Sequence, residues 1–153
     1  MLLAGGSSIS VLDSHKQTAL HVAASEGQEL VTELLIQKGI DTSIHNHHGK
    51  TALHLAALKG YEEVVRVLLC NGADISACDY LGYTALHYAT IGDLNTNPSP
   101  KTSDPSSLRG VGVVRLLLEK GTSASSKTNS GRTALHIAAH RGNEEATRQL
   151  LSV

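Results

Sequence analysis

Four copies of the tetrapeptide Thr-Ala-Leu-His constrain the fold of this 153-residue chain more than any other feature. The copies begin at Thr18, Thr51, Thr84 and Thr133. The first two intervals are 33 residues long, and the third, at 49 residues, is 33 residues with an insertion of 16. A fixed period of this length is typical of an array of small units that bury their apolar faces only against one another.

Each unit is predicted to form two helices joined by a tight turn. The first helix begins at the threonine, whose hydroxyl can accept hydrogen bonds from backbone N–H groups of the first turn. Glycines nine residues after the threonine are expected to end this short, alanine-rich helix in a left-handed conformation: Gly27, Gly60 and Gly142. The second, aliphatic helix is expected over residues 29–37, 62–70, 111–119 and 144–152.

The 33-residue period, the paired helices and the motif Thr-x-Leu-His-x-Ala resemble the ankyrin-repeat family. The resemblance covers nearly the whole chain and implies an all-α solenoid of stacked helix-turn-helix units with hairpin-like loops. It also implies that the repeated threonines and histidines are structural, with each histidine in buried hydrogen bonds between loops. These residues are Thr18, His21, Thr51, His54, Thr84, His87, Thr133 and His136.

Two features depart from the family pattern. The family usually has proline after the threonine of the motif, and alanine fills that position in all four copies. This substitution leaves the start of each helix slightly less fixed, because proline pre-sets the backbone φ angle. Lys16 stands where the later repeats have glycine, so the first turn is expected to differ in shape.

One domain is expected over residues 1–153. Its repeats are predicted at residues 7–39, 40–72, 73–121 and 122–153, with the last repeat incomplete and residues 1–6 as the end of a preceding repeat. Neither end has the polar capping repeat that an array needs for solubility. This pattern favours a piece of a longer array over a short protein with frayed ends.

All three prolines of the chain lie in the insertion of the third repeat, at about residues 93–109. The segment is polar, so it cannot form a core. Ser99 precedes Pro100 and Lys101, which resembles a proline-directed phosphorylation site, and a phosphate would add about −1.5 to −2 charges beside the array. The alternative is a passive surface loop, whose extra length costs little closure entropy.

The composition excludes several classes of function. A formal net charge of −1 gives no broad field to attract nucleic acid, and no apolar run is long enough to insert into a membrane. No nucleophile, phosphate-binding or dinucleotide-binding motif is present, so we expect neither enzymatic activity nor a cofactor. Two cysteines without a secretion signal indicate a reducing compartment, either cytoplasmic or nuclear.

Nine histidines are many for this length, and His45, His47 and His48 crowd one expected turn, beside His15 of the neighbouring repeat. Imidazoles this close can bind zinc or titrate together near neutral pH. No carboxylate is evident to orient them, and solvated residues that help to contact a partner are the simpler interpretation. We therefore predict no metal site and keep a metal- or pH-sensing role as a minor alternative.

The ankyrin resemblance implies a partner-binding surface on the concave face, formed by the tips of the turns and the exposed side of the first helices. At these positions the third repeat is apolar and the fourth is basic, and exposed aromatic and aliphatic clusters mark protein interfaces. The candidate partner-binding residues are Tyr80, Leu81, Tyr83, Leu58, Ile91, His47, His48, Lys50, Arg132, His140 and Arg141. We expect the apolar residues to anchor a protein or peptide whose acidic or polar part lies near Arg132 and Arg141. The alternative is that some of the apolar residues pack under the insertion.

The function predicted from the sequence is a non-catalytic, monomeric scaffold for protein–protein interaction. The alternative is a targeting or adaptor module of a larger protein, such as a kinase, a ubiquitin ligase or a channel. Nucleic-acid binding is not expected, because the charge is balanced and only the fourth repeat is locally basic.

Overall fold

The computed structural model describes residues 9–92 and 109–153. Within these ranges the chain forms eight helices and no strand, which confirms the predicted all-α class. The helices are α1 (Ala19–Ser25), α2 (Glu29–Gln37), α3 (Ala52–Lys59), α4 (Glu62–Cys70), α5 (Ala85–Ile91), α6 (Arg109–Glu119), α7 (Ala134–Arg141) and α8 (Glu144–Leu151). Residues 1–6, Ser99 and most of the predicted insertion lie outside the described residues, so the expectations for them stay predictions.

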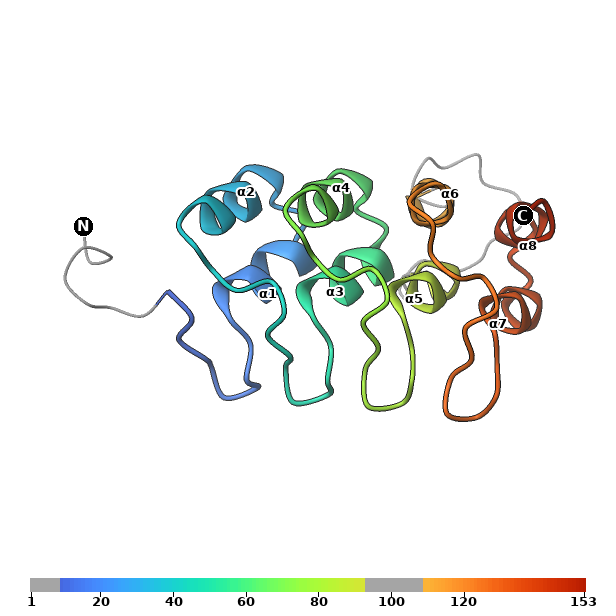
Figure 1. Ribbon diagram of the computed structural model, residues 1–153, viewed down its shortest axis with the longest axis horizontal. Helices are drawn as coiled ribbons and strands as arrows, with labels where there is room; N and C mark the ends of the chain where they lie inside the picture. Colours follow the sequence, from blue (N-terminus) through green and yellow to red (C-terminus); the bar gives the residue numbers. More distant parts are fainter. Residues whose placement is uncertain (1–8, 93–108) are drawn as a thin grey trace.

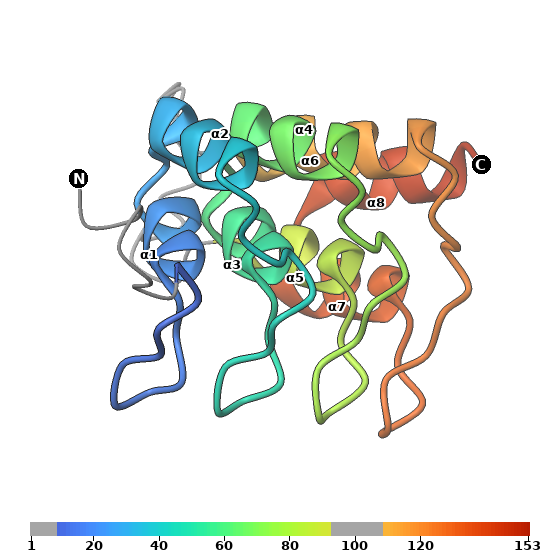
Figure 2. The ribbon, with the colours of Figure 1, turned by 60° about the vertical axis from the view of Figure 1, so that its left-hand side comes forward.

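The helices stack in two rows. The inner row consists of α1, α3, α5 and α7, and the outer row of α2, α4, α6 and α8 (Figure 1). Every helix packs against the next one in its row, and each inner helix packs against the outer helix that follows it. The long loops before the inner helices project side by side from the inner row (Figure 2). The result is a row of helix pairs that presents a row of loops along one edge.

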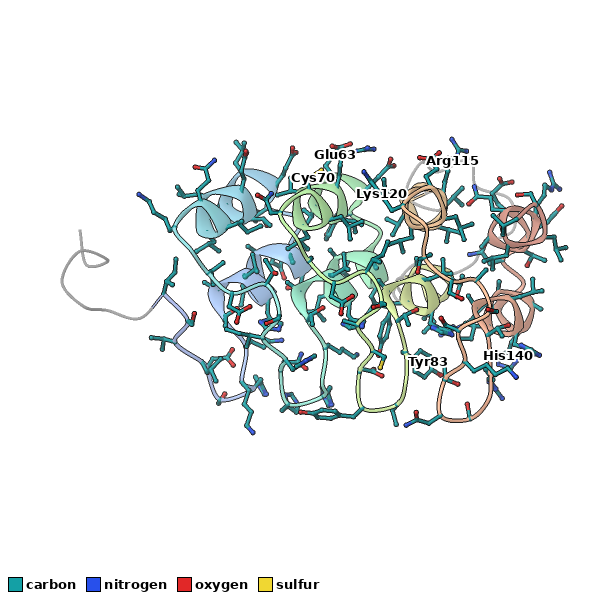
Figure 3. The ribbon with its side chains drawn as sticks, in the orientation of Figure 1. Glu63, Cys70, Tyr83, Arg115, Lys120 and His140 are labelled. Atoms are coloured by element: carbon teal, nitrogen blue, oxygen red, sulfur yellow. The ribbon has the colours of Figure 1, made fainter. Side chains whose placement is uncertain are left out.

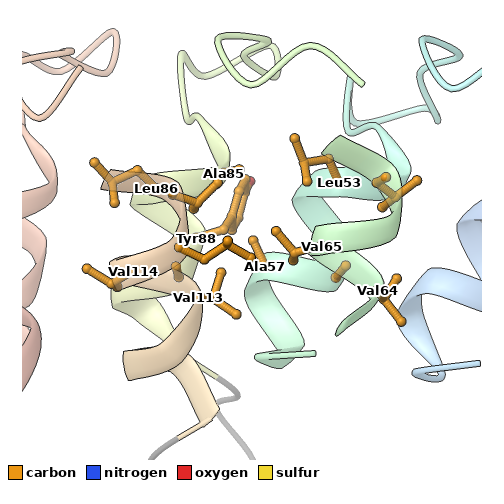
Figure 4. Packing of buried hydrophobic residues seen from close by; sticks show 14 of the residues in the cluster. Leu53, Ala57, Val64, Val65, Ala85, Leu86, Tyr88, Val113 and Val114 are labelled. Atoms are coloured by element: carbon orange, nitrogen blue, oxygen red, sulfur yellow. The ribbon is translucent and has the colours of Figure 1, made fainter. Parts of the chain in front are cut away.

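Small side chains make this close stacking possible. Completely buried alanines occur in all four inner helices: Ala24, Ala56, Ala57, Ala89 and Ala138. Valine and leucine from the outer row fill the space above them, and Figure 4 shows Ala57 and Val65 beside Tyr88 and Val113 at the junction of the second and third repeats. Because alanine lets neighbouring helices approach closely, the core is filled without phenylalanine or tryptophan.

The repeated threonine and histidine form the same hydrogen bond at the start of each inner helix. Each threonine precedes its inner helix, and its backbone N–H donates to Nδ1 of the histidine at 3.1, 2.9, 3.1 and 3.2 Å in repeat order. An Nδ1 that accepts leaves the ring proton on Nε2. In three repeats Nε2 donates across the next loop, from His21 to Lys50 O, from His54 to Ala77 O and from His87 to Ser126 O, at 3.0, 3.0 and 3.1 Å. These three imidazoles therefore tie each of the first three repeats to the next. The expectation of a buried hydrogen bond between loops is wrong for His136, which is exposed and bonds to Thr133 of its own repeat.

The inner helices α3 and α7 end at the predicted glycines, whereas α1 ends one residue before its glycine. Gly60 and Gly142 end α3 and α7 with φ angles of 76° and 69°, as expected for left-handed C-caps. The C-cap of α1 is instead Glu26, and Gly27 follows it with a φ angle of 72°. The third outer helix, α6, begins at Arg109, two residues earlier than the aliphatic pattern predicts.

The prediction that the first turn differs in shape is wrong. Lys16 adopts a φ angle of 58°, the left-handed conformation that the glycines of the later turns adopt. Its backbone N–H donates to Asp13 O at 3.0 Å, as that of Gly49 donates to Asn46 O at 2.9 Å. The hydrogen bonds of the turn thus impose the common shape on a residue that does not favour it.

Candidate partner-binding face

Neighbouring turn tips are joined by hydrogen bonds. We define the turn tips as residues 13–17, 46–50, 79–83 and 128–132. The backbone N–H and the Nδ1–H of His47 both donate to the carbonyl of His15, at 3.1 and 2.7 Å. The backbone N–H of Asn129 donates to Leu81 O at 2.9 Å, and its side-chain Nδ2 donates to Tyr80 O at 3.0 Å. The turn tips therefore form a tied row and not independent loops.

Each turn is also held from within by a polar residue five positions before the threonine: Asp13, Asn46, Asp79 and Thr128. In the first three repeats the side-chain Oδ1 accepts the backbone N–H groups two and four residues later, at 2.8–3.0 Å. In the fourth, the threonine Oγ1 accepts from the Arg132 N–H at 3.2 Å. These four residues were not predicted from the sequence, although their recurrence at one register position is a signal that would have revealed them.

Tyr80 and Leu81 are exposed at the third turn tip, with 67% and 64% of their surface accessible. One face of the Tyr80 ring lies on Gly49 of the preceding tip, where a Cβ atom would come within 2.6 Å of the ring. The missing side chain of glycine lets the ring approach the backbone this closely. Tyr80 is thus held on one face and open on the other, as an aromatic binding residue needs to be.

An open hollow of about 440 Å³ lies between the third and fourth repeats. Its walls come from α5, α7 and the adjoining turn tips: Tyr83, Ile91, Arg132, Ile137, His140 and Arg141. Figure 3 shows Tyr83 and His140 on the loop side of the array. Ile137, which is nearly buried, is the one lining residue that was not predicted from the sequence. The fold thus brings the apolar residues of the third repeat beside the basic residues of the fourth.

The other predicted partner-binding residues lie outside the hollow. The exposed ones are on the turn tips: His47, His48, Tyr80 and Leu81. The ammonium nitrogen of Lys50 lies 4.8 Å from the centre of the Tyr88 ring, so this side chain forms a cation–π contact with the protein itself. Leu58 is half-buried and packs against the core, which leaves only part of it for a partner.

The buried Tyr88 and the half-buried Tyr83 support the third turn tip from behind. The Tyr88 hydroxyl donates a hydrogen bond to Oδ2 of Asp79. Oδ1 of the same carboxylate accepts hydrogen bonds from two backbone N–H groups of the turn. Burial, followed by the hydrogen bond and the charge of Asp79, raises the pKa of Tyr88 above its ordinary value. The rings of Tyr83 and Tyr88 lie 5.5 Å apart. This cluster links α5 to the turn that carries Tyr80.

The histidines at and beside the first two turn tips lie close together, and the rings of two of them bond to the backbone. The His15 and His47 rings are 5.4 Å apart and the His47 and His48 rings are 3.7 Å apart. Nδ1 of His47 is bonded to a carbonyl, and so is Nδ1 of His45, to Gly49 O at 2.9 Å. Among the residues with described positions, no three histidine, cysteine or carboxylate side chains are arranged to hold a metal ion. Desolvation, followed by the nearby His47 and Lys50, lowers the pKa of His48.

A second exposed apolar surface, which was not predicted from the sequence, lies on the first repeat. Val22, Val31 and Leu34 are about half exposed, and Leu30 is 78% exposed. The residues that match Val31 in the later repeats are buried beneath the preceding repeat: Val64, Val113 and Ala146. We call Val22, Leu30, Val31 and Leu34 the first-repeat patch. Its exposure follows from its place in the stack, which residue type alone does not reveal.

The two cysteines, Cys70 and Cys78, are exposed and form no disulfide. Neither joins a group of residues suited to bind a metal within the part of the chain that the structure describes. In the same part of the chain, every helix is too short or too polar to cross a membrane.

Comparisons with known proteins agree with the geometry. A family model described as "Ankyrin repeats (3 copies)" matches residues 1–79, and one described as "Ankyrin repeats (many copies)" matches residues 109–151. No curated protein matches the chain. The period and the paired helices are those that the resemblance implied, and the chain belongs to the ankyrin-repeat family.

Proposed function

We propose that this chain is a non-catalytic scaffold that binds a partner protein or peptide on its turn tips and inner row. Ankyrin repeats are generally protein–protein interaction modules. The partner would be anchored by the turn-tip residues Tyr80 and Leu81 and would extend into the hollow between the third and fourth repeats. A preformed surface of this kind binds without ordering its own backbone, which lowers the entropic cost of association.

The observation that carries the proposal is that the turn tip with the exposed Tyr80 and Leu81 also contributes Tyr83 to the wall of the hollow. Two large apolar side chains are more than 60% exposed on a tip whose backbone is tied to both neighbouring tips. Exposed aromatic and aliphatic side chains on a rigid support, rimmed by polar groups, mark interaction sites. Because all of these residues come from one chain, the site is complete in a monomer.

Affinity capture from a lysate tests the proposal. The bait variant changes Tyr80→Ser and Leu81→Ser, two exposed residues whose loss should leave the fold intact. The matched control changes Leu30→Ser and Leu34→Ser, which removes two exposed leucines from the first-repeat patch. We expect proteins retained by the wild type to be lost from the first variant and kept by the second. Equal retention by all three baits would show that the turn tips are not the binding surface.

The same surface suits an adaptor role within a larger protein, because a scaffold needs no chemistry of its own. We further propose a reducing compartment, cytoplasmic or nuclear, since two exposed thiols without a disulfide suit a reducing environment. Nucleic acid is not the proposed partner, because a formal net charge of −1 provides no broad positive surface for a phosphate backbone.

A further inference from the structure

The net charge of −1 conceals a separation of charge between the two rows of helices. The spans of α1, α3, α5 and α7 contain no aspartate or glutamate. The outer helices contain seven of the described carboxylates: Glu29, Glu33, Glu62, Glu63, Glu119, Glu144 and Glu145. Against these seven carboxylates the outer spans hold four arginines, whereas the inner spans hold Lys59 and Arg141. Glu26, the C-cap of α1, lies in the first repeat, away from the hollow. The inner row is therefore positive relative to the outer row, although the whole chain is nearly neutral.

The carboxylates of the turn tips do not offset this field near the hollow. Asp79 is 6% exposed and accepts hydrogen bonds from the turn backbone and from Tyr88. Asp13 lies in the first turn tip, at the far end of the stack, where it accepts from backbone N–H groups. No described carboxylate lines the hollow.

Three basic side chains meet at the hollow without a described acidic partner. Arg132, His140 and Arg141 are exposed, line the hollow together, and form no ion pair with another described residue. The arginines of the outer row differ, because Arg66 pairs with Glu62 and Arg148 pairs with Glu144. A guanidinium without a carboxylate of its own presents a planar pair of donors to a carboxylate from outside.

Apolar walls complete the hollow. Tyr83 and Ile91 are half-buried and Ile137 is 5% exposed, so these side chains are fixed by packing. An apolar side chain placed against them would exclude water from the adjoining arginines, and an ion pair gains strength when water is excluded. The hollow thus combines one apolar contact with two guanidinium groups.

From this combination we infer that the hollow selects an acidic partner segment, in which an aspartate or glutamate lies beside an aliphatic or aromatic residue. The apolar side chain packs on Ile91, Ile137 and Tyr83, and the carboxylate pairs with Arg132 or Arg141. This inference rests on the proposed function, since it names the chemistry of the partner that the inner row and turn tips bind.

Selection from a displayed library of short random peptides tests the inference with the full chain. The test variant reverses two charges at the hollow, Arg132→Glu and Arg141→Glu. The matched control, Arg115→Glu with Arg148→Glu, makes the same change in net charge on the outer row. Both variants are checked for an unchanged melting temperature before selection.

We expect the wild type and the control variant to select peptides with aspartate or glutamate beside leucine, isoleucine, valine or phenylalanine. The test variant should lose this preference. A selected peptide resynthesised with glutamine or asparagine for its acidic residues should bind about tenfold more weakly, as loss of an interface hot spot does. Raising the salt concentration should weaken the acidic peptide more than its neutral version.

The outcomes separate the inference from the proposed function. Selected peptides without an acidic preference that are lost with Tyr80→Ser and Leu81→Ser would overturn the inference and leave the proposed function standing. Failure to retain any peptide, or retention unaffected by the inner-row and turn-tip variants, would overturn both. A single-stranded oligonucleotide that competes as strongly as the acidic peptide would show that the hollow recognises polyanions in general, which also overturns the inference.

Discussion

The ring of Tyr80 rests on Gly49, a residue of the preceding turn tip. A Cβ atom at Gly49 would lie 2.6 Å from Cδ1 of the ring, too close for any side chain. Gly49 also has a φ angle of 79°, which other residues rarely adopt. This glycine therefore serves two purposes, since it forms its own turn and supports the exposed aromatic residue of the next repeat.

Replacing Gly49 with alanine should displace Tyr80. Gly131 occupies the same turn position with a φ angle of 78°, and a Cβ atom added there would meet no described atom within 4 Å, so Gly131→Ala is the matched control. Both variants should lose about 1–2 kcal/mol of unfolding free energy from the left-handed backbone alone. Gly49→Ala should lose more, and only this variant should weaken partner binding. Equal urea denaturation curves for the two variants would show that the Tyr80 contact contributes nothing.

Three buried histidines should make the protein less stable in mild acid. Burial lowers the pKa of His21, His54 and His87 below the ordinary value of 6.5, opposed in part by the carbonyl groups that their Nε2 atoms contact. The unfolded chain therefore takes up protons before the folded chain does. The stabilisation is complete above the unfolded pKa and is lost as the pH falls through about 6.5 toward the lower folded values.

Urea denaturation between about pH 7.5 and 5 measures this effect, with a loss of up to about 1.4 kcal/mol per pH unit for each histidine. The carboxyl groups of Asp13, Asp41 and Asp74, whose pKa values are lowered by hydrogen bonds, stay ionised in this range. His54→Asn removes one of these three imidazoles and should have a shallower pH dependence than the wild type. A free energy of unfolding that stays constant or rises as the pH falls would contradict the lowered pKa values of the three buried histidines.

The variant Lys16→Gly should stabilise the protein. Lys16 holds a φ angle of 58° in a turn whose hydrogen bonds match those of the later, glycine-containing turns. Removing the side chain relieves the left-handed strain, with an expected gain of up to about 1 kcal/mol. Lys16→Ala keeps the strain and should give no gain, which separates the backbone effect from loss of the lysine charge. Thermal denaturation of the three proteins decides between these results.

The variant Tyr88→Phe should destabilise the third turn. It removes the hydroxyl that donates to the nearly buried Asp79 carboxylate, and an unsatisfied buried acceptor costs about 1–3 kcal/mol. Tyr80→Phe removes a hydroxyl from an exposed ring and should change the unfolding free energy by less than about 0.5 kcal/mol. Equal unfolding free energies for the two variants would show that the hydrogen bond from Tyr88 to Asp79 does not stabilise the fold.

Much of this architecture follows from local sequence. The period of Thr18, Thr51, Thr84 and Thr133 fixes where each inner helix begins, and the aliphatic runs place the outer helices within two residues of their observed ends. Contacts between repeats do not follow in the same way. The support of Tyr80 by Gly49, for example, depends on how neighbouring turns align in space.

The contacts between repeats that form the candidate site could not be predicted from the local sequence either. Register positions placed Arg132, His140 and Arg141 on one face, but their convergence with Tyr83 and Ile91 of the third repeat depends on the packing of α5 against α7. Leu58 occupies a position at which the family exposes its side chains, yet it packs partly against the core. The first-repeat patch could not be predicted from residue type, because identical valines are buried elsewhere in the stack.

Site-specific photo-crosslinking tests the central claim most directly, because large apolar side chains are exposed both at the third turn tip and in the first-repeat patch, and only the turn tip is proposed to bind the partner. A photoreactive benzophenone side chain replaces Leu81 at the third turn tip in one protein and Leu34 in the first-repeat patch in another, two leucines that are 64% and 52% exposed. We predict that the first protein crosslinks to a partner in lysate and that addition of unlabelled wild-type chain suppresses the product. Crosslinking from position 34 with none from position 81 would contradict the assignment of the partner to the turn tips and the hollow.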